Sequence, residues 1–263
     1  GDKLRILPMV SLFELLEQAP ARMPPQPRLL VLGGLDYGAV SKEQGAKDAR
    51  TWQPLPETEG EAEAVRDRFL RTFPKGTAQL LEGQNAPKTE LVRAVRNVHY
   101  LHIATHGYFA PEAQRGSRDV GRGRHLSPLA VRGLSPMVLT GLALSGANAQ
   151  GEGVITAEEM QTLDLASCRL VVLSACDTSV GVGRAGQGYA SLRTALVGAG
   201  ARFVLTSLWM VGDKPTRELM QEFYARLWDQ GMSPHQALWE AKKVMRSRGA
   251  AFRDWAGWVL TGQ

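Results

Sequence analysis

Short apolar runs recur along the chain and are separated by stretches in which apolar residues return at helical spacing. Runs of about four to eight apolar residues, bounded by glycine, proline or polar residues, are typical of buried strands. The sequence predicts strands at residues 28–33, 77–81, 99–104, 169–174 and 201–208, and a closing apolar segment at 255–260.

The intervening stretches carry helix-start signals. Thr58 and Glu61 have the spacing of a capping box, and Pro87 is placed to open a second helix. A further helix is predicted around Leu192, a long one over residues 213–229, and a last one capped by a serine and a glutamine at 233 and 236. Near-continuous apolar strands alternating with helices indicate an α/β fold with a mostly parallel sheet covered on both faces. Active sites of such sheets form beyond the carboxyl ends of the strands.

Composition narrows the class of protein. The chain has 263 residues, of which 44% are hydrophobic and 22% charged, as in ordinary globular proteins. No apolar run approaches the roughly 18 residues of a membrane span, and the first residues do not resemble a signal peptide. We therefore expect a cytoplasmic protein with no membrane partner. Residues 36–56 and 108–135 are predicted loops, the second rich in arginine and glycine.

The net charge of +5 could suggest nucleic-acid binding, but its distribution argues against it. Five arginines lie within residues 108–133 against Glu112 and Asp119, which places +3 of the charge in this one loop. The remaining charge is spread thinly, so we expect no direct binding of nucleic acid. The loop has the composition of a self-cleaving or regulatory segment and equally that of an ordinary solvated loop, and both interpretations remain open.

Two predicted strands end in chemically capable side chains. One is followed by His106 and Gly107, and the other by Cys176 and Asp177. If the strands are neighbours, about 4.8 Å apart, imidazole and thiol can face each other as in a cysteine hydrolase. Gly107 would allow a substrate carbonyl to approach the backbone. The structural alternative is a small core cysteine beside a histidine that makes ordinary hydrogen bonds.

Other motifs give weaker signals. Cys168 begins the strand that leads to Cys176, about 26 Å away if the strand is regular, so a redox pair is not expected and Cys168 is predicted to be inert. His102 and His106 would lie about 13 Å apart on a strand, which disfavours zinc, and we expect His99 and His102 to be buried structural residues. Residues 181–186 spell G-x-G-x-x-G too far from the strand for a dinucleotide site, so a nucleotide-dependent enzyme is a weak third hypothesis. No metal or other cofactor is expected.

Several segments together resemble the CHAT family, a caspase-like group of cysteine proteases often found beside tetratricopeptide repeats and related in fold to caspases and separase. They read HIATHG, LVVLSACDTS, GQGYASLRTALVGAGARFVLTSLWMV and DWAGWVLTG. The segments at residues 6–11 and 155–159 also resemble the family, the latter as its short helix before the cysteine strand. The resemblance implies a caspase-like three-layer α/β/α sandwich over residues 1–263, a single domain that starts after the family's most N-terminal strands.

The resemblance also implies a function. It suggests a cysteine endopeptidase with a His106–Cys176 dyad and an oxyanion hole built from the backbone N–H groups of Gly107 and Cys176. The substrate-binding residues that it suggests are Asp177, Ser207, Trp209 and Asp213. Trp209 could instead be a core aromatic at a strand end, and Asp213 a helix N-cap. We expect cleavage after a basic or mid-sized residue.

As partners, the family suggests a protein substrate and a regulatory repeat or sensor domain. It suggests the role of a regulated effector protease in bacterial signalling or defence. The sequence departs from the family at Gln187, where the family often has glutamate, and over residues 210–213, where it often has a proline and paired acids. The competing hypothesis is a catalytically silent CHAT-like binding or scaffold module.

Overall fold

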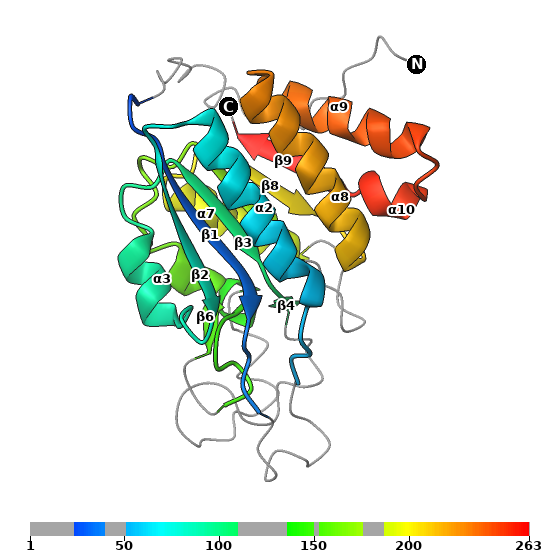
Figure 1. Cartoon of the computed structure of the whole chain (residues 1–263). Coiled ribbons are helices and arrows are strands. Elements are labelled where there is room, and N and C mark those ends of the chain that lie inside the picture. Colours follow the sequence, from blue (N-terminus) through cyan, green and yellow to red (C-terminus); the bar gives the residue numbers. More distant parts are fainter. Residues whose placement is uncertain (1–23, 40–50, 110–135, 150–152, 176–186, 263) are drawn as a thin grey trace.

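A computed structural model describes residues 24–39, 51–109, 136–149, 153–175 and 187–262. Its centre is a six-stranded sheet in which the first five strands run parallel and the last is antiparallel (Figure 1). The order across the sheet is β2 (Thr77–Gly83), β1 (Arg28–Leu35), β3 (Tyr100–Ala104), β7 (Leu170–Ser174), β8 (Phe203–Ser207) and β9 (Trp258–Gly262). The predicted mostly parallel α/β sheet is confirmed.

Helices cover both faces of this sheet. One face packs against α2 (Pro56–Thr72), α8 (Asp213–Tyr224), the π-helical turn η3 (Ala225–Asp229) and α9 (Pro234–Ser247), which lie in front of the sheet in Figure 1. The other face packs against α3 (Lys88–Ala94), α6 (Ala157–Met160) and α7 (Gln187–Gly198). Two further short helices are α5 (Pro136–Leu139) and α10 (Phe252–Trp255). None of the helices in the described ranges is long and apolar enough to cross a bilayer.

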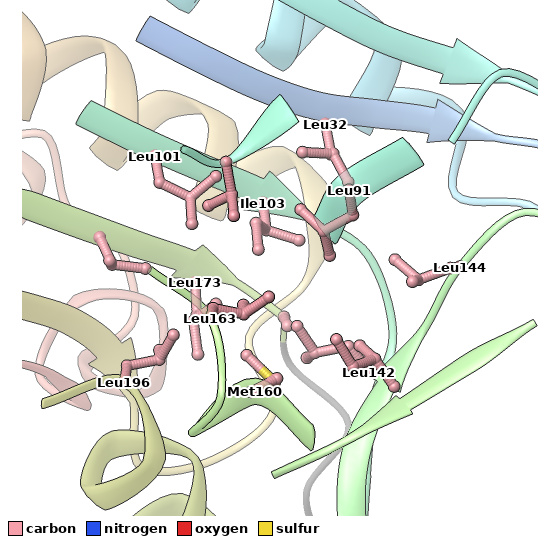
Figure 2. Packing of buried hydrophobic residues seen from close by; sticks show 14 of the residues in the cluster. Leu32, Leu91, Leu101, Ile103, Leu142, Leu144, Met160, Leu163, Leu173 and Leu196 are labelled. Carbon is pink, nitrogen blue, oxygen red and sulfur yellow. The ribbon is translucent and has the colours of Figure 1, made fainter. Parts of the chain in front are cut away.

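The strands explain why the core has two halves. On β1, Leu29 and Val31 face α2 and α8, whereas Leu30 and Leu32 face α3 and α7. Figure 2 shows the second half, in which leucines of the strands meet Leu91 of α3 and neighbouring helical side chains. Because successive side chains of a strand alternate in direction, a strand buried on both faces is apolar at every position, as the sequence runs suggested.

A second, smaller sheet follows β3 directly. It is antiparallel and consists of β4 (Gly107–Phe109), β5 (Thr140–Ala143) and β6 (Val154–Thr156). The predicted loop over residues 108–135 is wrong for Tyr108 and Phe109, which belong to β4. The predicted short helix over residues 155–159 starts only at Ala157, after β6. Strands of three or four residues are too short to show a clear alternation.

Helix starts agree with the sequence only in part. Ser233 and Gln236 form the predicted capping box of α9. The capping box predicted from Thr58 and Glu61 is wrong, because α2 already begins at Pro56 and its cap residue makes no side-chain bond. Asp213 is likewise not an N-cap: Gly212 precedes the helix and Asp213 is its first residue.

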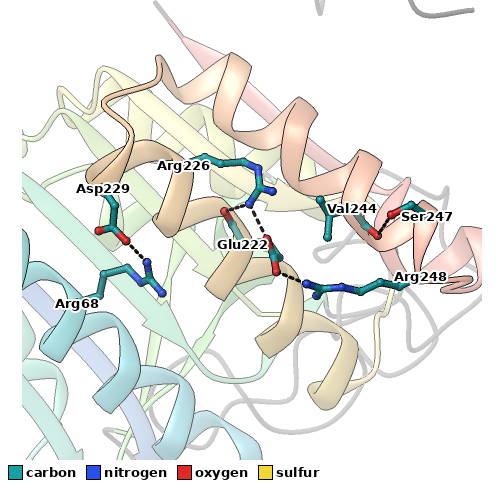
Figure 3. Close-up of polar contacts among 7 residues, drawn as sticks. All are labelled: Arg68, Glu222, Arg226, Asp229, Val244, Ser247 and Arg248. Atoms are coloured by element: carbon teal, nitrogen blue, oxygen red, sulfur yellow. Dashed lines mark hydrogen bonds and ion pairs between the residues drawn. The ribbon is translucent and has the colours of Figure 1, made fainter.

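Ion pairs join the helices on the α2 side of the sheet (Figure 3). Arg68 of α2 pairs with Asp229 of η3. Glu222 of α8 binds Arg226 one turn later and also Arg248, whose Nη2 lies 2.7 Å from Oε1 of Glu222. Partly exposed pairs of this kind contribute about 0–1 kcal/mol each, so apolar packing is the main force that holds this layer on the sheet.

Candidate active site

The carboxyl ends of β3 and β7 lie side by side, which is the condition that the predicted dyad requires. The strands pair in parallel with Ala104 opposite Ser174, and the backbone N–H of Thr105 donates to the carbonyl of Ser174 at 3.3 Å. His106 follows Ala104 by two residues, and Cys176 follows Ser174 by the same number. Cys176 and Asp177 themselves lie outside the described residues. The structure thus describes the histidine and the strand that leads to the cysteine.

The imidazole of His106 is held by a backbone carbonyl. Its Nε2 atom lies 2.7 Å from the carbonyl oxygen of Gln53, in the segment that precedes α2. A carbonyl oxygen can only accept a hydrogen bond, so Nε2 carries the proton and donates it. In the neutral ring the other nitrogen, Nδ1, is then unprotonated. His106 therefore has the tautomer of a base that acts through Nδ1.

Two aromatic rings flank this imidazole. The ring centres of Tyr37 and Trp52 lie 5.2 and 5.4 Å from that of His106. Tyr37 donates its hydroxyl proton to Oγ1 of Thr105 at 2.9 Å, since Thr105 itself donates to the carbonyl of Ala143 at 2.6 Å. Burial raises the pKa of Tyr37, and its contacts with the Thr105 hydroxyl and with the backbone of His106 oppose the increase only in part. Tyr37 is thus a neutral phenol that ties the end of β1 to the histidine.

Sequence reasoning missed Gln53, Tyr37 and Trp52. All three lie in the predicted loop over residues 36–56, which has no periodic pattern. The only available signal was the position of Tyr37, two residues beyond the apolar run of β1 and hence at the same edge of the sheet as His106.

The backbone N–H group of Gly107, predicted as part of an oxyanion hole, lies in the first residue of β4. Gly107 pairs with Leu142 in the small sheet, next to a bond in which the carbonyl of His106 accepts from the N–H of Ala143 at 2.9 Å. Bonded and non-bonded pairs alternate in an antiparallel ladder, so the N–H of Gly107 is directed away from β5. The strand leaves this donor at the outer edge of the small sheet.

Asp213 brings a carboxylate to the same region. Its side chain is half-buried at the start of α8. Burial raises the pKa of Asp213, the charge of His106 opposes the increase, and Glu61 and Glu57 add to it. The predicted substrate-binding acid is therefore within electrostatic reach of the predicted base.

Ser207 and Trp209 form a turn at the end of β8. Ser207 is buried, and its hydroxyl donates to the carbonyl of Trp209 at 2.6 Å, so its side chain is already engaged. The indole of Trp209 is half-buried, donates to the carbonyl of Arg253 at 2.7 Å and stacks against Phe252. Phe252 is 68% exposed, so this aromatic pair reaches the surface. The pairing of β8 with β7 ends at Leu205, so Thr206 and Ser207 extend beyond it on that edge of β8.

The other thiol is not part of this region. Cys168 is buried two residues before β7, and its sulfur donates to the carbonyl of Leu170. Burial raises the pKa of Cys168 to about 12, which keeps the thiol protonated at neutral pH. The predicted inert position of Cys168 is consistent with both observations.

His102 belongs to a separate buried cluster. It is fully buried between α2 and α8, with Nδ1 3.0 Å from the hydroxyl of Tyr224 and Nε2 3.1 Å from Oε1 of Glu61. The second contact does not meet the geometry of a hydrogen bond, so the two atoms are close neighbours without a hydrogen bond between them. His102 and His106 therefore have different partners and do not converge on a common ligand. His99 is only half-buried and accepts from the N–H of Arg28.

Comparison with known proteins identifies the family of the chain. The family model of the CHAT domain matches residues 2–263, nearly the whole chain. A human protein, "Tetratricopeptide repeat protein 28", is 28% identical over 226 residues, which cover 82% of this chain and 9% of the human protein. The chain thus spans only about a tenth of the length of that relative. On the evidence of the family match, the chain belongs to the CHAT domain family.

Proposed function

We propose that the chain is a cysteine endopeptidase with a caspase-like three-layer sandwich, in which Cys176 is the nucleophile and His106 the base. The observation that carries the proposal is the register of β3 and β7, which ends with Ala104 opposite Ser174. His106 comes two positions after Ala104, and Cys176 comes two positions after Ser174. The bond between Nε2 of His106 and Gln53 adds support, because it leaves Nδ1 to accept a proton.

In this mechanism the thiol proton of Cys176 moves to Nδ1 of His106. The thiolate attacks the carbonyl carbon of the scissile peptide, and the electron pair of the double bond moves to the oxygen. Collapse of this intermediate breaks the C–N bond, and the leaving amine takes the proton from His106. His106 then takes a proton from water, and the water oxygen attacks the thioester carbon. The C–S bond breaks, and His106 returns the proton to the sulfur of Cys176. General acid–base help of this kind contributes about 10²- to 10⁴-fold.

The negative oxygen of the intermediate needs fixed donors. The N–H of Gly107 is directed away from the small sheet and is one candidate, and the N–H of Cys176 is the second. Two backbone donors are the usual composition of such a site, and they need no rearrangement during the reaction.

Substrate residues before the scissile bond would lie along the end of β8. Ser207 contributes only backbone, because its hydroxyl is bonded to Trp209. Trp209 with the exposed Phe252 offers an apolar wall, and Asp213 with Asp177 offers negative charge beside the dyad. We propose a basic or mid-sized residue at the cleavage position and an added strand as the mode of substrate binding.

The context of the domain is also part of the proposal. The human relative is named for its tetratricopeptide repeats and is far longer than the matched region. We propose that a repeat or sensor domain, attached or separate, controls access of a protein substrate to this chain. A cytoplasmic location and a bacterial signalling or defence role stay predictions.

The decisive experiment maps new protein N-termini after incubation of a proteome with the chain. Wild type should generate termini that Cys176→Ala does not, whereas Cys168→Ala, the matched control at the other cysteine, should generate the wild-type set. Equal termini from wild type and Cys176→Ala would overturn the proposal. Absence of new termini from wild type together with its activating partner would favour the silent scaffold.

A further inference from the structure

Asn148 lies in the turn after β5 and is 94% buried, with an exposed fraction of 6%. All of its polar side-chain atoms are used. Its Oδ1 accepts from the N–H of Trp52 at 2.8 Å, and its Nδ2 donates to the carbonyls of Trp52 and Gly38, each at 2.9 Å. Its backbone N–H donates to the carbonyl of Tyr37 at 2.7 Å. One residue therefore binds the backbone at both aromatic residues that flank His106.

The orientation of the amide follows from its partners. A backbone N–H can only donate, so the atom facing the N–H of Trp52 must be the oxygen. The nitrogen then has two protons for two carbonyls. Asparagine satisfies this set completely, whereas aspartate offers acceptors only and would set a negative charge against two carbonyl oxygens.

These bonds lead directly to the imidazole. Trp52 is bound at both its N–H and its carbonyl, and the next carbonyl along the chain, that of Gln53, accepts from Nε2 of His106 at 2.7 Å. No regular element runs through residues 51–55, so the helix and sheet ladders do not fix this carbonyl. Its position depends on how the neighbouring peptide units are held.

We infer that Asn148 is a positioning residue that fixes the Nε2–H tautomer and the orientation of His106 through the backbone of Trp52 and Gln53. It does not contact the reacting groups. Without it, the segment over residues 51–55 loses two side-chain bonds, both to Trp52, and Gly38 loses a third. The carbonyl of Gln53 then moves, and His106 can carry its proton on either nitrogen. The effect of Asn148 on catalysis rests on the proposed function. Its effect on the tautomer of His106 is independent of that function.

The test uses nitrogen-15 spectra of the histidine rings in the full chain, with the His106 signals assigned from a His106→Asn variant. In wild type, the neutral ring of His106 should be a single Nε2–H tautomer. Asn148→Ala and Asn148→Asp should both show a mixture. The matched control is Ser145→Ala, since Ser145 is buried in the same turn but donates to the carbonyl of Gly83, and it should retain the wild-type tautomer.

A folded Asn148 variant that keeps the pure Nε2–H tautomer would overturn the inference, as would a mixture in Ser145→Ala. If Asn148→Ala does not fold, Asn148→Asp, which keeps the volume and the oxygen facing Trp52, carries the test. In peptidase assays, kcat should fall by about 10-fold or more in the Asn148 variants, within the ~10²- to 10⁴-fold range of acid–base help, while KM changes little. If wild type cleaves nothing but the Asn148 variants still show a mixture of tautomers, the proposed function is refuted and the inference about Asn148 stands.

Discussion

The carbonyl oxygen of Gln53 accepts a hydrogen bond from Nε2 of His106 at 2.7 Å, although 53 residues separate the two in the sequence. The group that orients the proposed base is thus part of the main chain. A side-chain substitution at position 53 leaves it in place, whereas a change in the residues that hold the segment displaces it.

Gln53→Ala should therefore have almost no effect on peptide cleavage. The side chain of Gln53 is exposed, and exposed substitutions usually change free energies by about 0.5 kcal/mol or less. Trp52→Phe should lower kcat more, because the smaller ring packs less closely against His106. Steady-state kinetics on one peptide substrate would compare the two. A 10-fold loss in Gln53→Ala would mean that its side chain, and not its carbonyl, is the functional group.

Cys168 should make the fold sensitive to alkali. Burial raises its pKa from 9.0 to about 12, so between these values the folded chain keeps a proton that the unfolded chain releases. The free energy of unfolding from this group then falls as pH rises through this window, by at most about 1.4 kcal/mol per pH unit. From pH 8 to 10, urea unfolding should show a decrease about 1 kcal/mol smaller in Cys168→Ala than in wild type. Parallel decreases in the two proteins would contradict this.

The buried cluster around His102 should contribute measurably to stability. Glu61→Gln removes the charge that faces Nε2 of His102, and we expect the free energy of unfolding to fall by about 1–3 kcal/mol. Glu63→Gln is the matched control, since Glu63 is exposed on the same helix, and its effect should stay below about 0.5 kcal/mol. Chemical denaturation at pH 7 measures both. Similar values for the two variants would show that the buried contact contributes nothing.

Gly257 should be important for the shape of the apolar wall that Trp209 and Phe252 form. A Cβ atom at this position would lie 2.5 Å from Cε2 of Trp209, so Gly257→Ala must displace the indole. We expect KM to rise about 5-fold, equivalent to about 1 kcal/mol of lost substrate contact, with kcat nearly unchanged. Gly60→Ala is the control, because its Cβ would meet only the flexible end of Arg217 at 3.3 Å. Unchanged KM in Gly257→Ala would remove Trp209 from the proposed substrate site.

The parts of the fold that sequence predicted are those with a local signal. The β7 strand is an apolar run up to Ser174, β3 is apolar except at His102, and each is followed within two residues by a residue with reactive chemistry. The short strands β4 to β6 and the role of Asn148 have no such signal. Asn148 and Trp52 are 96 residues apart, and their contact depends on backbone groups that every residue possesses.

Local signals also failed where tertiary structure overrides them. The spacing of Thr58 and Glu61 fits a capping box, but Pro56 starts α2 earlier and places both residues within the helix. There Thr58 accepts from the N–H of Gly34 instead, and Glu61 shares the buried face of Ala62 and Val65. A charged residue on that face has no place in a pattern of apolar positions, so its partner could be found only in three dimensions.

His106 follows Ala104 by two residues, and Cys176 follows Ser174 by the same number. This equal spacing in the sequence limits where the chain can change in length. Thr105, between Ala104 and His106, forms a bend, so one residue inserted after Ala104 would displace the imidazole from Tyr37 and from the Gln53 carbonyl. Relatives that keep this chemistry should therefore have no insertion or deletion between Ala104 and His106 or between Ser174 and Cys176.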